Sequence, residues 1–183
     1  MVTDLSGYAG QVLRIDLTKK KMHSIKLERD LAVGFLGGRG FNSKRLYDEL
    51  APRIDPLGPE NKLIFATGPL VGTMFPTACR LNISAKSPLT GILGDSNAGG
   101  HFAAELKFAG YDQVILEGRS RKPTYLFIDG GEVEFRDASL LMGKDVYEAD
   151  KVIKDDLADR RVQTAIVGPA AENGVKYAGV YLN

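Results

Sequence analysis

The residues best suited to holding a ligand gather in one stretch of the chain, Gly68–Asp112. Its glycines let the backbone approach a ligand closely or take positive φ. They are Gly68, Gly72, Gly91, Gly94, Gly99 and Gly100, and the polar donors among them include Thr73, Thr77, Arg80, Asn82, Lys86 and Asn97. Loops of this composition hold phosphorylated ligands through backbone N–H groups. The stretch therefore predicts a site for a phosphate-bearing ligand.

The end of this stretch leads from a polar loop into a helix. Asn97-Ala98-Gly99-Gly100 runs directly into HFAAELKFAG, whose apolar residues have helical spacing. A ligand anion placed here would meet the N-terminus of that helix, where free N–H groups favour negative charge.

Several long motifs resemble one known family. The run PTACRLNISAKSPLTGILGDSNAGGHFAAELKFAGYDQVILEG is similar to the N-terminal domain of the tungsten-containing aldehyde:ferredoxin oxidoreductases, and so are LGGRGFNSKRLYDEL, IDPLGPENKLIFATGPLVGT and IVGPAAENGVKYAGV. Motifs of this length are far more specific than a lone glycine pattern. The resemblance extends along essentially the whole chain.

The resemblance implies that residues 1–183 form a pterin-cofactor-binding N-terminal domain, without its C-terminal end or the downstream iron–sulfur domains. In the family, two pterins hold one tungsten or molybdenum atom, magnesium bridges their phosphates, and a 4Fe–4S cluster passes electrons to ferredoxin. The reaction oxidises an aldehyde to a carboxylic acid. This chain contains none of the cluster ligands, so alone we expect it to be inactive. Homodimerisation also occurs in the family.

Three residues match cofactor contacts of the family. Arg80 matches a pterin-contacting arginine, Asn97 an asparagine whose main-chain oxygen helps to hold magnesium, and Gly99 a backbone contact. From the residues alone, Arg80 suits a surface salt bridge as well as it suits a phosphate. Asn97 and Gly99 are equally typical of an ordinary turn before a helix. A non-catalytic scaffold module that contacts a partner subunit is the alternative function.

Composition excludes several other classes. With 183 residues, 44% of them hydrophobic, the chain can bury the core of one domain. A net charge of +1 argues against bulk nucleic-acid binding, and no apolar run has the length of a membrane span, so we expect a cytoplasmic protein. The single cysteine, Cys79, cannot hold an iron–sulfur cluster, and two histidines, His23 and His101, do not make a multi-histidine metal site.

Other polar residues have simpler interpretations. We interpret Lys86 as a solvated turn residue, Cys79 as a small buried residue and His101 as a helix cap. The run Gly37-Gly38-Arg39-Gly40 resembles a phosphate cradle, but we favour a helix terminator. Glu105 and Asp112 have no visible partner, so no acid–base pair is nominated and no catalytic residue is predicted.

The elements repeat one order in the two halves of the chain. The first half predicts a hairpin (Gln11–Leu17, Met22–Leu27), a short helix capped by Asp30, a helix over Gly40–Leu50 and a strand over Asn61–Thr67 that ends at Gly68-Pro69. The second half predicts a hairpin (Thr124–Ile128, Glu132–Arg136), a helix over Asp145–Leu157 and a strand over Gln163–Val167 that ends at Gly168-Pro169.

Between the halves we expect strands over Leu81–Ala85, Thr90–Leu93 and Gln113–Glu117. The pattern favours an α+β domain with two sheets and helices, built by internal duplication; chance repetition of common elements is the alternative.

Overall fold

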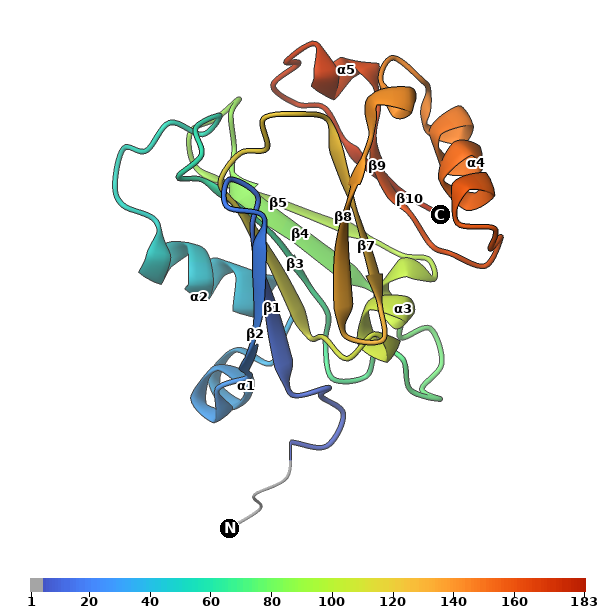
Figure 1. The fold of residues 1–183 in the computed structure, drawn as a ribbon. Helices are drawn as coiled ribbons and strands as arrows, with labels where there is room; N and C mark the ends of the chain where they lie inside the picture. The colour runs from blue at the N-terminus through green and yellow to red at the C-terminus, as the bar shows by residue number, and fades with distance from the viewer. Residues whose placement is uncertain (1–4) are drawn as a thin grey trace.

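A mixed six-stranded sheet lies at the centre of the protein (Figure 1). Its strands are β1 (Gln11–Asp16), β2 (Lys21–Lys26), β3 (Lys62–Ala66), β4 (Leu81–Lys86), β5 (Leu93–Ala98) and β6 (Gln113–Glu117), in the order β2-β1-β6-β3-β4-β5. β6 pairs parallel to β1 and antiparallel to β3, and the other pairs are antiparallel. The structure, a computed structural model, describes residues 5–183; residues 1–4 of the predicted domain lie outside the described part.

Helices cover one face of this sheet. They are α1 (Arg29–Phe35) and α2 (Arg39–Glu49). Because side chains alternate along a strand, Val12, Ile64 and Ile115 face these helices in a buried cluster around Phe41. Their strand neighbours, such as Val114, point to the opposite face.

The opposite face is covered by the second half of the chain (Figure 1). Its elements are α3 (Phe102–Phe108), β7 (Thr124–Asp129), β8 (Glu132–Asp137), the 3-10 turn η1 (Ser139–Leu141), α4 (Val146–Asp156), β9 (Ala165–Val167), α5 (Pro169–Glu172) and β10 (Val180–Leu182). The strands form two separate antiparallel pairs, β7-β8 and β9-β10. A third cluster packs α4 against β9 through Ala149, Ile153 and Ile166.

The predicted α+β class and most predicted elements are confirmed. Both hairpins, the strands β3, β4 and β6, and the helices α2, α3 and α4 form within a few residues of the expected bounds. Asp145 caps α4, since its carboxylate accepts the N–H groups of Tyr147 and Glu148 at 2.9 Å each. Each half follows the predicted order of hairpin, helix and strand.

Two local predictions are wrong. The strand expected over Thr90–Leu93 instead begins at Leu93 and runs to Ala98, because Ser87–Ile92 forms the turn of a hairpin in which Gly91 has a φ of +73°. The residue that precedes α1 is Glu28, which makes no side-chain cap, while Asp30 lies within the first turn. No helix in residues 5–183 combines the length and apolar character that crossing a membrane requires.

Candidate binding site at the open end of the β4–β5 hairpin

The β4–β5 hairpin brings the three predicted cofactor-binding residues together. Asn82 pairs with Asn97 and Leu81 pairs with Ala98. Arg80 directly precedes Leu81 and Gly99 directly follows Ala98, so both residues lie next to the last pair of the hairpin. Since paired residues of antiparallel strands have Cα atoms about 4.5–5.5 Å apart, Arg80 and Gly99 lie near one another and near Asn97.

The backbone of Asn97 points away from β4. The N–H of Ser87 donates to the carbonyl of Ile92 at 2.8 Å, which fixes the hydrogen-bonding phase of the hairpin. Hydrogen-bonded pairs alternate with non-hydrogen-bonded pairs along an antiparallel ladder, so Asn82 and Asn97 form a non-hydrogen-bonded pair. β5 is the last strand of the sheet, so the N–H and carbonyl of Asn97 face an open edge.

The side chain of Arg80 is exposed and, within residues 5–183, makes no hydrogen bond or ion pair. Beside it, a Cβ added to Gly99 would meet nothing within 4 Å. The next residue, Gly100, has a φ of +105°, and a Cβ there would lie 3.6 Å from the carbonyl oxygen of Asn183. The unpaired guanidinium of Arg80, the edge carbonyl of Asn97 and the accessible backbone of Gly99 therefore lie at the same end of the hairpin.

A buried amide network supports the hairpin from beneath. The side chain of Asn82, 2% exposed, donates to the carbonyl of Ser96 at 3.1 Å and accepts from Asn42 at 2.8 Å. Gln113 in turn donates to Asn42 at 3.0 Å. The prediction that Asn82 is a ligand donor is wrong, because internal partners occupy its amide. Its position instead fixes the strand that carries Asn97.

Asp95, two residues before Asn97 on the same face of β5, adds a negative charge that is already paired. Arg39 donates to it at 2.6 Å from the first turn of α2. Burial acts to raise the pKa of Asp95, but hydrogen bonds from Asn82 and Arg39 and the charge of Arg39 together lower it below its ordinary value. Asp95 therefore stays ionised near neutral pH, and its charge is balanced by Arg39.

We predict that replacing Arg39 by Gln raises the pKa of Asp95. A carboxyl with a lowered pKa contributes stability above its unfolded pKa and loses it as pH falls through the folded value. The variant should therefore show a weaker loss of stability on acidification than the wild type. Carbon-detected NMR titration of the Asp95 carboxyl measures the shift, with Arg29→Gln on α1 as the control. An identical titration of Asp95 in all three proteins would contradict the assigned ion pair.

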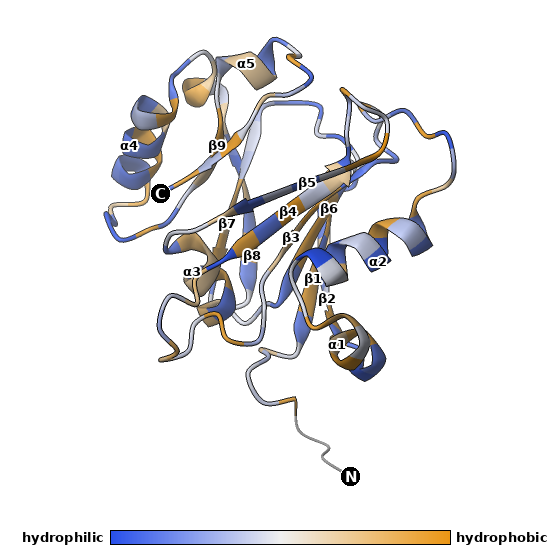
Figure 2. Ribbon diagram, turned by 180° about the vertical axis from the view of Figure 1, so that it is seen from behind, coloured by the Kyte–Doolittle hydropathy of each residue, from blue (hydrophilic) through white to orange (hydrophobic). Residues whose placement is uncertain are grey.

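The other polar candidates lie in different surroundings. Lys86 is not a solvated turn residue, since its ammonium donates to the carbonyl of Ile54 at 2.8 Å. Cys79 is half-buried, and His101 is exposed at the N-cap of α3 without a side-chain cap. The expectation that Asn97 lies in a loop before the helix is wrong, because Asn97 belongs to β5. Pairing with β4 holds Asn97 in a strand. The polar sequence of β5 gives no sign of that strand (Figure 2).

The glycine run Gly37–Gly40 acts as a tight connection, as the favoured interpretation predicted. The N–H of Gly38 donates to the carbonyl of Thr67 at 2.9 Å. A Cβ on Gly37 would lie 2.6 Å from that same oxygen, and a Cβ on Gly40 would lie 2.1 Å from the carbonyl of Phe35. The glycines therefore let α1, α2 and β3 approach closely.

Asp112 does have a partner, contrary to the sequence interpretation. Its fully buried carboxylate forms an ion pair with Lys107, whose side chain is 7% exposed. It also accepts the N–H groups of Ala9 at 3.1 Å and Gly10 at 2.7 Å. Since every contact is internal, Asp112 ties the N-terminal segment to the turn before β6.

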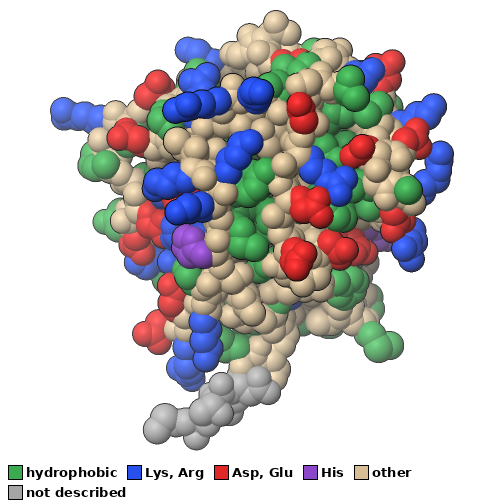
Figure 3. Space-filling model, in the orientation of Figure 1, with side chains coloured by type: hydrophobic (Ala, Val, Ile, Leu, Met, Phe, Trp, Pro, Cys, Tyr) green, Lys and Arg blue, Asp and Glu red, His purple; other side chains and the backbone are tan. Residues whose placement is uncertain are grey.

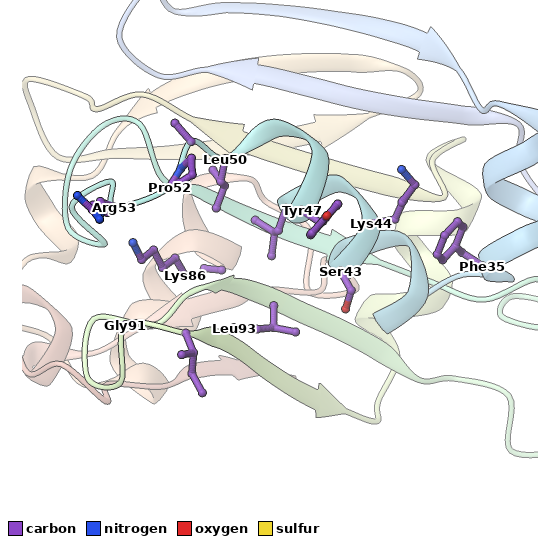
Figure 4. A pocket seen from close by; sticks show the side chains of 14 residues that line it. Phe35, Ser43, Lys44, Tyr47, Leu50, Pro52, Arg53, Lys86, Gly91 and Leu93 are labelled. Atoms are coloured by element: carbon purple, nitrogen blue, oxygen red, sulfur yellow. The ribbon is translucent and has the colours of Figure 1, made fainter.

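A separate groove lies at the other end of the same hairpin (Figure 4). It has a volume of about 720 Å³ and runs between α2 and the β4–β5 turn, lined by residues such as Tyr47, Lys86 and Leu93. Arg80, Asn97 and Gly99 do not line it. In residues 5–183 no group of three or more His, Cys, Asp or Glu side chains is arranged to hold a metal ion, so a metal at the Asn97 edge would need ligands of other kinds, such as backbone oxygens.

Comparisons with known proteins agree with the resemblance. A profile of the aldehyde ferredoxin oxidoreductase N-terminal domain matches residues 12–183. The tungsten-containing aldehyde ferredoxin oxidoreductase of Pyrococcus abyssi is 48% identical over 97% of this chain and 29% of its own length. An aliphatic sulfonate oxidoreductase WOR-like subunit of Pyrococcus furiosus is 34% identical over 95% of this chain and 30% of its own.

A solved structure is also similar. It is the active-site complex BamBC of benzoyl coenzyme A reductase with 1,5-dienoyl-CoA, in which one chain superimposes with a TM-score of 0.95 and 41% identity. The match covers 97% of this chain and 27% of that one. This chain thus spans about three-tenths of the length of the curated relatives that it matches. From profile, identity and fold together, the chain belongs to the aldehyde ferredoxin oxidoreductase family and corresponds to its N-terminal domain.

Proposed function

We propose that this chain is the cofactor platform of an oxidoreductase that oxidises aldehydes to carboxylic acids with ferredoxin as electron acceptor. In this proposal, the open end of the β4–β5 hairpin binds the phosphates of a tungsten or molybdenum bis-pterin. The observation that carries the proposal is the unpaired Arg80 guanidinium beside Gly99 and the outward-facing backbone of Asn97. Similarity to tungsten-containing aldehyde ferredoxin oxidoreductases supports a tungsten cofactor as the ligand.

Each of the three residues has a separate task in this proposal. The Arg80 guanidinium donates two hydrogen bonds to phosphate oxygens, for which its planar fork is suited. The backbone at Gly99 comes close to the ligand because no side chain intervenes. The carbonyl of Asn97 offers one oxygen to magnesium, a cation that prefers oxygen ligands.

The bound pterin metal supplies the redox chemistry, and the protein supplies position. The platform orients the cofactor through the β4–β5 hairpin, which the Asn82 amide network holds rigid. In this proposal, other domains of the enzyme bind ferredoxin, the aldehyde and the 4Fe–4S cluster. Alone, the 183-residue chain is expected not to oxidise aldehydes.

Arg80→Ala is expected to weaken phosphate binding about 10- to 100-fold, because a hydrogen bond to a charged group contributes roughly 1.5–3 kcal/mol. Binding of magnesium pyrophosphate to the purified chain, followed by amide NMR shifts, measures this. The shifts should centre on residues 80 and 97–100.

Arg53→Ala is the matched control, since Arg53 is exposed beside the groove at the opposite end of the hairpin. It removes the same charge and should leave pyrophosphate binding unchanged. Equal losses in both variants would indicate nonspecific attraction and would contradict the proposed site. Tungsten, molybdenum and pterin content of protein purified from cofactor-producing cells provides a second readout, and Arg80→Ala should lower it. A metal-free and pterin-free wild-type chain that forms a stable complex with a partner subunit would favour the scaffold alternative.

A further inference from the structure

A second arginine, Arg39, lies beside the proposed phosphate site. It belongs to the first turn of α2, and α2 covers the face of the β4–β5 hairpin on which the Asn82 side chain lies. Asn97 pairs with Asn82, and Asp95 lies two residues before Asn97, so both side chains share this face. Because a strand rises about 3.4 Å per residue, Asp95 and Asn97 are only about 7 Å apart. Asp95, the partner of Arg39, therefore lies next to the residue whose carbonyl is proposed to meet magnesium.

The guanidinium of Arg39 has only one of its nitrogens engaged. That terminal nitrogen lies 2.6 Å from a carboxylate oxygen of Asp95, and the Arg39 side chain is 66% exposed. Within residues 5–183 the side chain makes no other hydrogen bond or ion pair. A guanidinium has five N–H donors in a fixed planar fork. The unused N–H groups of Arg39 are therefore available to a second acidic group.

The backbone that carries Arg39 and the carboxylate that it meets are both held in place. The N–H of Gly38 donates to the carbonyl of Thr67 at 2.9 Å, and a Cβ at Gly38 would lie 3.7 Å from that of Asn82. The second oxygen of Asp95 accepts a hydrogen bond from the Asn82 amide at 2.5 Å. A side chain that is already oriented loses less freedom when a ligand binds. The Arg39–Asp95 pair is therefore preorganised beside the open end of the hairpin.

We propose that Arg39 is a second phosphate-binding residue at the open end of the β4–β5 hairpin, and that Asp95 is the residue that positions its guanidinium. The inference rests on the proposed function. One edge of the guanidinium stays on Asp95 while its free N–H groups bond a phosphate, and Arg80 bonds another phosphate. Two guanidinium groups and one carboxylate leave the site positively charged, as an anionic ligand requires. The site therefore prefers a ligand that carries two phosphates over one that carries a single phosphate.

Other exposed cations attract phosphate by charge alone. Residues 19–21 are all lysines, and they adjoin residues 119–122, which include three Lys or Arg residues, since the N–H of Arg119 donates to the hydroxyl oxygen of Thr18 at 2.8 Å. Figure 3 shows Lys and Arg side chains gathered at the upper left of the face drawn there. Arg121 is exposed in this group and, within residues 5–183, forms no ion pair. Its replacement is therefore the matched control for Arg39.

Arg39→Gln should weaken binding of magnesium pyrophosphate to the purified chain about tenfold or more, because it removes a hydrogen bond to a charged group. Binding of orthophosphate, which needs only one arginine, should change little. Amide NMR shifts at residues 80 and 97–100 follow both titrations and show that the variant is folded. Arg121→Gln should bind both anions as the wild type does.

Asp95→Asn separates the positioning of Arg39 from the effect of charge. Removal of a negative charge beside an anion site strengthens anion binding if charge acts alone. Loss of the anchor of Arg39 instead adds the cost of ordering one long side chain, so we expect pyrophosphate binding to weaken about two- to tenfold. The replacement amide can still accept the hydrogen bond from Asn82, so the hairpin is retained.

The outcomes separate this inference from the proposed function. Unchanged pyrophosphate binding in Arg39→Gln, with weaker binding in Arg80→Ala, would overturn the second arginine and leave the proposed function in place. Tighter binding in Asp95→Asn would overturn the positioning role. An equal loss of orthophosphate and pyrophosphate binding in Arg39→Gln would overturn the preference for two phosphates. Pyrophosphate binding that neither arginine affects, or that Arg121→Gln weakens equally, would overturn the proposed function and this inference together.

Discussion

Replacing Asp112 by Ala should lower the free energy of unfolding by about 3–5 kcal/mol, the usual cost of leaving one member of a buried ion pair alone. The carboxylate is fully buried, and its loss leaves the ammonium of Lys107 and the N–H groups of Ala9 and Gly10 without their partner. Urea unfolding at pH 7 measures the change, and the Tm should fall by roughly 10 °C.

Asp48→Ala is the matched control for this prediction. Asp48 also pairs with a lysine, Lys44, but both side chains are largely exposed, at 45% and 38%. Exposed pairs of this kind contribute about 0.3–0.5 kcal/mol. If Asp112→Ala cost no more than Asp48→Ala, Lys107 would have to reach solvent in the folded protein, and the buried pair would be wrong.

Replacing Gly40 by Ala should destabilise the protein by about 1–2 kcal/mol. A Cβ at Gly40 would lie 2.1 Å from the carbonyl oxygen of Phe35, so α1 and α2 must separate. Alanine would gain about 1 kcal/mol from helix propensity, but overpacking against rigid backbone costs more than that gain. Thermal and urea unfolding both report the net effect.

Gly34→Ala, in the same part of the fold, should change the stability in the opposite direction. Gly34 lies in α1, and a Cβ there would meet nothing within 4 Å, so alanine should stabilise the helix by about 0.5–1 kcal/mol. A stable Gly40→Ala variant would remove the packing explanation for the glycine run and return it to the phosphate-cradle interpretation. Pyrophosphate titration of that variant would then decide the matter.

Local patterns were sufficient for most elements of this fold. Alternation predicted β1 and β2, the Asp-Gly turn predicted the β7-β8 hairpin, and Asp145 marked the start of α4. These signals depend on neighbours in sequence, which is why their bounds differ from the structure by only a few residues.

Long-range pairing decided what the sequence did not reveal. The middle of β5, Asp95-Ser96-Asn97, is polar and exposed, so β5 lacks the alternation of a half-buried strand, and only its register with β4 identifies it. Asp112 showed no sign of burial, since Ala9 and Gly10, whose N–H groups it accepts, are about a hundred residues away in the sequence. The proximity of Arg80, Asn97 and Gly99 was expected from the family resemblance. The outward direction of the Asn97 N–H and carbonyl follows only from the hydrogen-bonding pattern of the β4–β5 hairpin.

The polar strand at the end of the six-stranded sheet has a consequence for how the protein behaves in concentrated solution. An open strand edge is a template for aggregation, because any extended chain can add to it. The sequence Gly94-Asp95-Ser96-Asn97 offers few apolar side chains for an added strand to pack against. It also places the charged Asp95 on this edge strand. This edge can therefore keep its backbone oxygens available to small polar ligands without recruiting neighbouring molecules.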